Sequence, residues 1–140
     1  MRNVITAFLL LVPLLTLLAP TAHATTNTIV NISGQVSIDG VTVTVRAHAS
    51  GTPSALSGAG TDTPDSLSKF AGNPLVCHWP VTGSVSAGVV TLAGIATQSS
   101  VRAEIGTPIT LTADASTGSI TWTFDGLTLT GTGTVDIRNA

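Results

Sequence analysis

The sequence predicts an all-β protein built from antiparallel hairpins, and three observations support this prediction. Two Asp-Gly pairs, Asp39-Gly40 and Asp125-Gly126, each stand between runs in which apolar and polar residues alternate. Alternation with a period of two is typical of strands that bury one face, and Asp-Gly between such runs is a strong hairpin signal. Threonine, which favours strands, recurs at alternate positions over Thr121–Thr123 and Thr128–Thr134. No segment carries a sustained helical stripe of apolar residues.

The first 24 residues have the pattern of a secretory signal peptide. Arg2 supplies a positive charge, an apolar run extends from Ile5 to Leu18, and Ala22-His23-Ala24 is a small-x-small cleavage site. The apolar run is shorter than the roughly 20 residues that span a bilayer. We therefore expect a signal peptide over residues 1–24, a single all-β domain over residues 25–140, and a secreted, periplasmic or cell-surface protein. We expect no membrane insertion after cleavage.

The first predicted hairpin turns at Asp39-Gly40. A two-residue turn there pairs Ile38 with Val41, and counting outward pairs Val36 with Val43. Every pair on this face is apolar or glycine, so the face is expected to be buried. The opposite face is polar and is expected to meet solvent; it carries Asn31, Ser33, Gln35, Ser37, Thr42, Thr44, Arg46 and His48. Asn31-Ile32-Ser33 on this face is also a glycosylation sequon.

The stretch after this hairpin is predicted to be a long loop. Residues 50–74 are rich in glycine, proline, serine and aspartate and show no period. One turn of helix is expected after Pro64, over Asp65–Phe70. A weaker hairpin signal follows at Ala87-Gly88, where the alternation pairs Val85 with Val90.

The remaining segments complete the strand count. Val101–Ile105 and Ile109–Ala113 alternate and are expected to be strands, and the last hairpin pairs Phe124 with Leu127 and turns its threonines outward. The total is about seven to eight strands, whose apolar faces must cover one another. We therefore predict an antiparallel β-sandwich, immunoglobulin-like or of a related type, with a small barrel as the alternative.

The charge balance excludes some partners. Without the signal peptide the chain has four basic and seven acidic residues, which gives a net charge near −3. It has no basic stripe and no cluster of aromatic residues, so nucleic acid is disfavoured. The expected partners are a second copy of the chain or a neutral extracellular ligand. The outward threonine rows resemble, in this motif alone, the surfaces of some ice-binding proteins, although threonine is also a common residue of solvated strands.

No pattern predicts catalysis or a cofactor. Beyond the signal peptide the chain has two histidines, scattered acids and no Gly-x-Ser-x-Gly motif. His48, Cys77 and His78 lack the spacing of a blue-copper site, because Cys77 and His78 are adjacent and alternate residues of a strand face opposite ways. Asp62 and Asp65 are too few for a calcium loop. We expect no enzyme activity, no metal and no cofactor.

Cys77 is the only cysteine, so no internal disulfide can form. The alternation in residues 75–79 places it on one side with Leu75 and Trp79, which favours a buried thiol. The alternative is a disulfide between two chains.

The leading hypothesis for function is a secreted non-enzymatic protein that acts by contact, as a surface or matrix component or an adhesive module. Self-association through edge strands is its expected mechanism. The alternative is a small-ligand or carbohydrate-binding module that uses residues 50–80. In that alternative Trp79 or Phe70 provides a stacking platform, and Asp62 or Asp65 provides a polar anchor.

Overall fold

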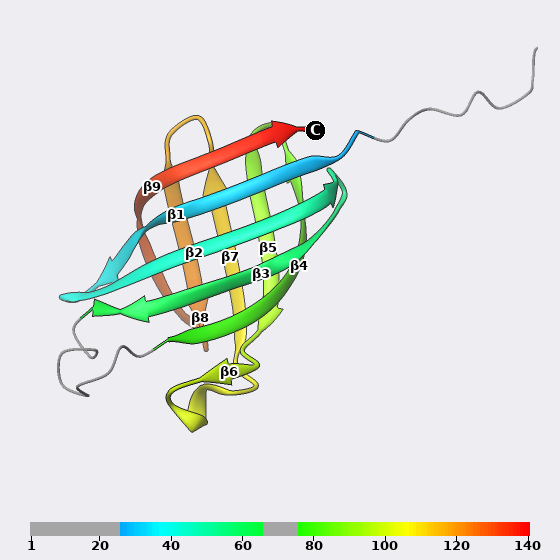
Figure 1. The fold of residues 1–140 in the computed structure, drawn as a ribbon. Helices are drawn as coiled ribbons and strands as arrows, with labels where there is room; N and C mark the ends of the chain where they lie inside the picture. Colours follow the sequence, from blue (N-terminus) through cyan, green and yellow to red (C-terminus); the bar gives the residue numbers. More distant parts are fainter. Residues whose placement is uncertain (1–25, 66–75) are drawn as a thin grey trace, which may run out of the picture.

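The computed structural model describes residues 26–65 and 76–140, which form a closed antiparallel β-barrel (Figure 1). The strands lie in the order β3-β2-β1-β9-β8-β7-β5-β4-β6, and a further pairing of β3 with β4 closes the sheet on itself. Eight strands form the barrel, and β6 is a two-residue strand that pairs with the start of β4. The all-β antiparallel prediction is confirmed, but the sandwich is wrong and the barrel alternative is what forms.

The barrel strands follow one another around the barrel in chain order. Their bounds are β1 Thr28–Ile38, β2 Val41–Thr52, β3 Ala55–Pro64, β4 Cys77–Ser86, β5 Val89–Ile95, β7 Pro108–Asp114, β8 Ser119–Phe124 and β9 Leu127–Asn139. The last strand returns to pair with the first. Between β5 and β7 the chain forms β6 (Gln98–Ser99) and a 3-10 helix, η1 (Arg102–Glu104), which project at one end of the barrel (Figure 1).

The three predicted hairpins have the registers that the alternation indicates. Ile38 is paired with Val41, Val85 with Val90, and Phe124 with Leu127. Type I′ turns need a positive φ at both central residues. The turns satisfy this with Asp39, Ala87 and Asp125 at φ values of 46, 52 and 49°, each followed by a glycine with positive φ. The turn chemistry therefore fixes the register of each hairpin locally.

The predicted loop over residues 50–74 is wrong in part, because it contains β3. Alternation is hidden in this strand because two of its inward positions are Gly58 and Gly60. A Cβ at Gly60 would lie 2.1 Å from the ring of Trp79, so the glycine leaves room for that ring. The apolar side chain that covers Gly60 on the inner side of β3 is thus Trp79, which belongs to β4. For this reason the sequence of β3 itself shows no alternation of apolar and polar residues.

The predicted strand over Val101–Ile105 is also wrong, because this segment contains η1. Val101 and Ile105 are exposed, 38% and 50% respectively. The alternation here does not mark a face that packs against the core. By contrast, the neighbouring prediction over Ile109–Ala113 is confirmed by β7.

The barrel interior is filled by side chains. Eight-stranded barrels have an interior just wide enough for this. Trp79 is fully buried, and Trp122 is buried with its ring stacked on Phe124 at a centroid distance of 5.4 Å. The other buried apolar residues come from all eight strands and include Val30, Val36, Val45, Leu56, Val90, Leu92, Leu111, Ile120 and Leu129.

Some predictions fall on residues that the structure does not describe. The signal peptide over residues 1–24 and most of the helical turn over Asp65–Phe70 lie outside the described residues. Within residues 26–65 and 76–140, no helix has the length and apolar character needed to cross a membrane.

Candidate functional site

Two of the four residues predicted to bind a ligand, Trp79 and Asp62, lie inside the barrel. Their exposed fractions are 0% and 4%. The indole Nε1–H of Trp79 donates a hydrogen bond of 2.8 Å to Asp62 Oδ2, so each polar group satisfies the other. Trp79 is therefore a core residue in this structure and not a platform open to solvent.

The other two predicted residues do not join them. Asp65, at the end of β3, accepts hydrogen bonds from Gln35 Nε2 at 3.3 Å and from Thr44 Oγ1 at 3.2 Å, which are outward-facing side chains of β1 and β2. Phe70 lies outside the described residues. The structure thus places Asp62 and Asp65 on different sides of the barrel wall.

The buried carboxyl of Asp62 has an unusual pKa. Burial raises this pKa from its ordinary value of 3.8 to about 6, the hydrogen bond from Trp79 opposes the rise, and the charge of Glu104 adds to it. Glu104 is held near by η1 and accepts a hydrogen bond of 2.5 Å from Ser99 Oγ. The segment between β5 and β7 therefore brings a second acid towards Asp62.

Cys77 is buried, with an exposed fraction of 1%. Burial and the negative charges of Asp62 and Glu104 raise the pKa of its thiol to about 12. Since the thiolate is the reactive form, the thiol is inert near neutral pH and is out of reach of a second chain. The buried position of Cys77 is the one that the alternation favours, and the folded barrel does not present its thiol for the alternative, a disulfide between two chains. Cys77 faces inward, whereas His48 and His78 are exposed, so the three do not share a face.

We expect Cys77 to resist labelling in the native protein. Incubation with a thiol-reactive aromatic disulfide at pH 7.5 should give no reaction on a timescale of minutes, and addition of urea should give stoichiometric reaction. A native protein that reacts at the rate of a free cysteine, or that runs as a disulfide-linked dimer without reductant, would contradict the buried position of this thiol.

A groove of about 530 Å³ lies on the outside of the barrel and crosses β9, β1, β2, β3 and β4. Its polar lining consists of outward residues of these strands: Asn31, Ser33, Arg46, His48, Thr61, His78, Thr134, Asp136 and Arg138. We call this surface the outer groove. The strand register places five of these residues side by side in one row across five neighbouring strands. In order, they are Thr134, Ser33, Arg46, Thr61 and His78.

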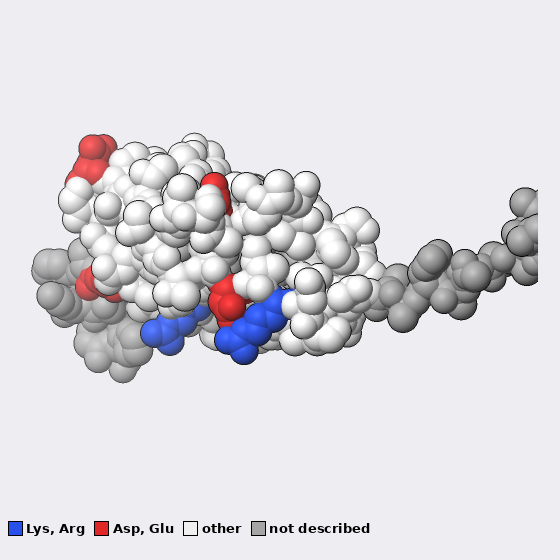
Figure 2. All heavy atoms as spheres, turned by 90° about the horizontal axis from the view of Figure 1, so that it is seen from above, with Lys and Arg blue, Asp and Glu red and all other residues white. Residues whose placement is uncertain are grey.

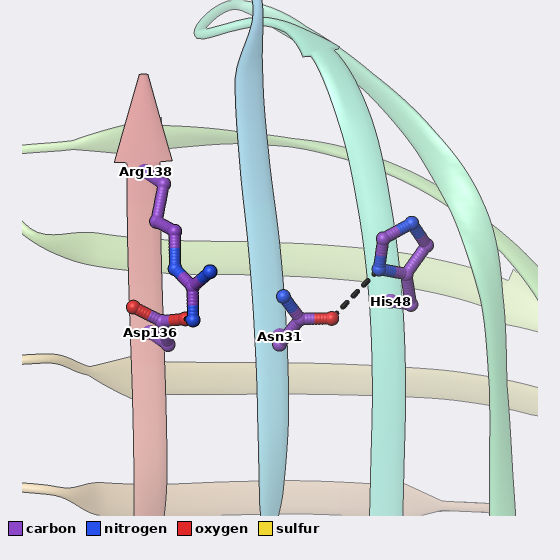
Figure 3. A network of polar contacts seen from close by, with 4 residues as sticks. All are labelled: Asn31, His48, Asp136 and Arg138. Atoms are coloured by element: carbon purple, nitrogen blue, oxygen red, sulfur yellow. Dashed lines mark hydrogen bonds and ion pairs between the residues drawn. The ribbon is translucent and has the colours of Figure 1, made fainter. Parts of the chain in front are cut away.

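A polar network lies next to this row (Figure 3). His48 Nδ1 is 2.7 Å from Asn31 Oδ1, and Arg138 forms an ion pair of 2.6 Å with Asp136. Because an amide oxygen can only accept, His48 Nδ1 carries the hydrogen and Nε2 is left to interact with another group. Figure 3 shows Asn31 between the Arg138–Asp136 pair on β9 and His48 on β2.

The outer groove concentrates the cationic groups of the described chain. It holds both histidines of the described residues and two of their three arginines, whereas only Asp136 of the seven acidic residues lines it. With neutral histidines its formal charge is 2 − 1 = +1, although the whole chain carries −2. Figure 2 shows the arginine side chains along one side of the barrel, beside an acidic group.

Only some of the residues that line the outer groove could be predicted from the sequence. Alternation already indicates that Asn31, Arg46 and His48 face outward. His78, Asp136 and Arg138 join them only because β3 pairs with β4 and β9 pairs with β1. The outward threonines of β8 and β9 are confirmed in their register, with Thr123 Oγ1 3.2 Å from Thr128 Oγ1, and of this row Thr134 lines the groove.

Comparison of the chain with protein-family models, with curated proteins and with solved structures finds no match.

Proposed function

We propose that the protein is an exported binding protein that acts by contact and not by catalysis, and that the outer groove is the surface it uses. The observation that carries this proposal is the gathering of both described histidines and two arginines in one hollow on an acidic chain. A hollow with a few convergent polar groups is the usual form of a ligand site. The signal-peptide pattern of residues 1–24 supports export.

The packed interior favours an outer site. Trp79 and Trp122 belong to the core inside the barrel, and both are at least 96% buried. Asp62 and Trp79 Nε1, which could otherwise orient a ligand inside, are bonded to each other. A ligand in the interior would have to displace these side chains, at the cost of core packing.

Within the described residues, His48 is hydrogen-bonded to an amide and not to a nucleophile. The ring of His48 is oriented by the amide of Asn31, with its Nδ1 at 2.7 Å from the amide oxygen. A nucleophilic mechanism needs a hydroxyl or thiol within hydrogen-bond reach of the base. The only cysteine of the chain is buried on the other side of the wall. These features support binding rather than covalent catalysis.

The closed barrel changes the expected mode of self-association. Each of the eight barrel strands pairs with a neighbour on both sides. Strand addition needs an unpaired edge, so that mechanism has no template along these strands. Association between copies of the chain would have to use side-chain surfaces.

Solution NMR of the ¹⁵N-labelled protein over residues 25–140 tests the proposed site directly. The protein is titrated with a set of charged and neutral small molecules, and shifts are mapped onto the assigned amides. We expect the binding members of the set to shift amides of Asn31, Arg46, His48 and Thr61. The amides of β7 and β8, on the far side of the barrel, serve as the internal control. Binding that shifts β7, β8 or the interior instead, or no binding by any member, would refute the outer groove as the functional surface.

A further inference from the structure

We infer that the outer groove selects ligands that carry carboxylate groups, and that Arg46 is their main anchor. This inference rests on the proposed function and adds the chemical class of the ligand. It replaces the neutral ligand expected from the overall charge of the chain.

Arg46 lies at the centre of the groove with its charge available. It is exposed, and it stands between Ser33 on β1 and Thr61 on β3. Within the described residues the arginine that forms an ion pair is Arg138, so Arg46 has no such partner there. Another acid on this face, Asp65, lines an adjoining hollow together with Arg46 and accepts hydrogen bonds from Gln35 and Thr44.

The groups around Arg46 match the needs of a carboxylate. A guanidinium donates two parallel hydrogen bonds to one carboxylate, which leaves further lone pairs on the carboxylate oxygens. The hydroxyls of Ser33 and Thr61 flank Arg46 on the neighbouring strands and can donate to those lone pairs. A neutral ligand would instead cover the guanidinium without giving it a charged partner, which is unfavourable.

The second arginine of the groove, Arg138, is paired with Asp136 and is therefore a weaker anchor for an anion than Arg46. Arg138 and Asp136 lie on β9, two strands away from Arg46 on β2. Neighbouring strands are about 4.8 Å apart, and Arg138 lies four residues along β9 from Thr134, which shares a row with Arg46, so the two arginine positions are roughly 16 Å apart. His48 lies on the same outer face, two residues along β2 from Arg46, and its Nε2 can make a further contact. Free organic acids and short uronate oligosaccharides both carry carboxylates that Arg46 could bind.

The test uses three probes and matched arginine variants. Citrate represents a free organic acid, trigalacturonate represents an acidic oligosaccharide, and maltotriose is the neutral comparison. Affinity is measured by NMR titration at low salt for the wild type, Arg46→Gln, Arg46→Lys and Arg102→Gln. Arg102 is the control because it is an exposed arginine in η1 that does not line the groove. Circular dichroism confirms that each variant is folded.

We expect at least one of the two acidic probes to bind in the groove. Tighter binding of citrate would indicate a free organic acid as the ligand, and tighter binding of trigalacturonate would indicate an acidic oligosaccharide. Arg46→Gln should weaken this binding about tenfold or more, Arg46→Lys should weaken it less, and Arg102→Gln should leave it unchanged. Raising the NaCl concentration should weaken it further, because salt screens the attraction. Equal binding of maltotriose in the groove, or no loss in Arg46→Gln, would overturn the carboxylate inference and leave the proposed function standing. If none of the probes shifts groove amides at millimolar concentration, the carboxylate inference fails, while the broader set of small molecules decides the proposed function.

Discussion

Replacing Gly60 with alanine should destabilise the barrel by about 3 kcal/mol, the upper part of the usual range for overpacking a core. The new Cβ would lie 2.1 and 2.2 Å from Cζ3 and Cη2 of Trp79. The ring cannot move away freely because it is fully buried and its Nε1 is bonded to Asp62. Urea unfolding followed by circular dichroism measures the change in the free energy of unfolding.

A double-mutant cycle separates this steric effect from the loss of glycine itself. In a Trp79→Phe background the smaller ring no longer fills the space over Gly60, so Gly60→Ala should cost much less there than in the wild type. An equal cost in both backgrounds would show that Trp79 does not lie against β3. The comparison therefore tests the pairing of β3 with β4 as well as the packing.

Replacing Asp62 with asparagine should stabilise the protein at pH 7 to 8 by about 2 to 3 kcal/mol. The carboxyl is 4% exposed and its pKa is raised from 3.8 to about 6, chiefly by burial. The folded state therefore binds the proton more tightly than the unfolded state does. Stability is fully present below pH 4, falls as the pH rises towards 6, and stays low once Asp62 is ionised. Asparagine has no charge to bury, and its Oδ1 can still accept the hydrogen bond from Trp79.

The measurement is the free energy of unfolding of Asp62→Asn and of the wild type from pH 4 to pH 8. The difference between them should be small near pH 4 and should grow up to about pH 6. Asp114→Asn provides a control of opposite sign, because hydrogen bonds from Ser116 lower the pKa of Asp114. The native Asp114 carboxylate stabilises the folded state at neutral pH, and this contribution is lost as the pH falls. Asp114→Asn should therefore be less stable than the wild type at neutral pH, and the difference should shrink in acid. A constant difference between Asp62→Asn and the wild type across this range would refute the raised pKa.

The hairpins could be predicted because their causes are local. Asp39-Gly40 and Asp125-Gly126 supply the positive φ values of the turn, and the alternation on either side then fixes every pair. The choice between sandwich and barrel was not local. It depends on the pairing of β1 with β9, whose partners Thr28 and Asn139 lie at opposite ends of the domain.

The candidate site was harder to predict than the fold. The outward position of Arg46 and His48 follows from the first hairpin alone, but the residues that complete the groove come from β3, β4 and β9. The strand β3 could not be recognised because Gly58 and Gly60 hide its period. Alternation predicts that Trp79 shares one face of its strand with Cys77, and the structure shows that this face is the core, which leaves Trp79 closed to a ligand on the surface.

The central claim is that the sheet closes into a packed barrel, so that contact with other molecules takes place on its outer face. Cross-strand nuclear Overhauser effects at the two closing seams test this most directly, between Val30 and Ile137 for β1 and β9 and between Gly58 and Val81 for β3 and β4. The account predicts these contacts at both seams, together with slow amide exchange of β4. Absence of either set, with rapidly exchanging amides along that seam, would mean an open sheet or a sandwich and would contradict the closed barrel.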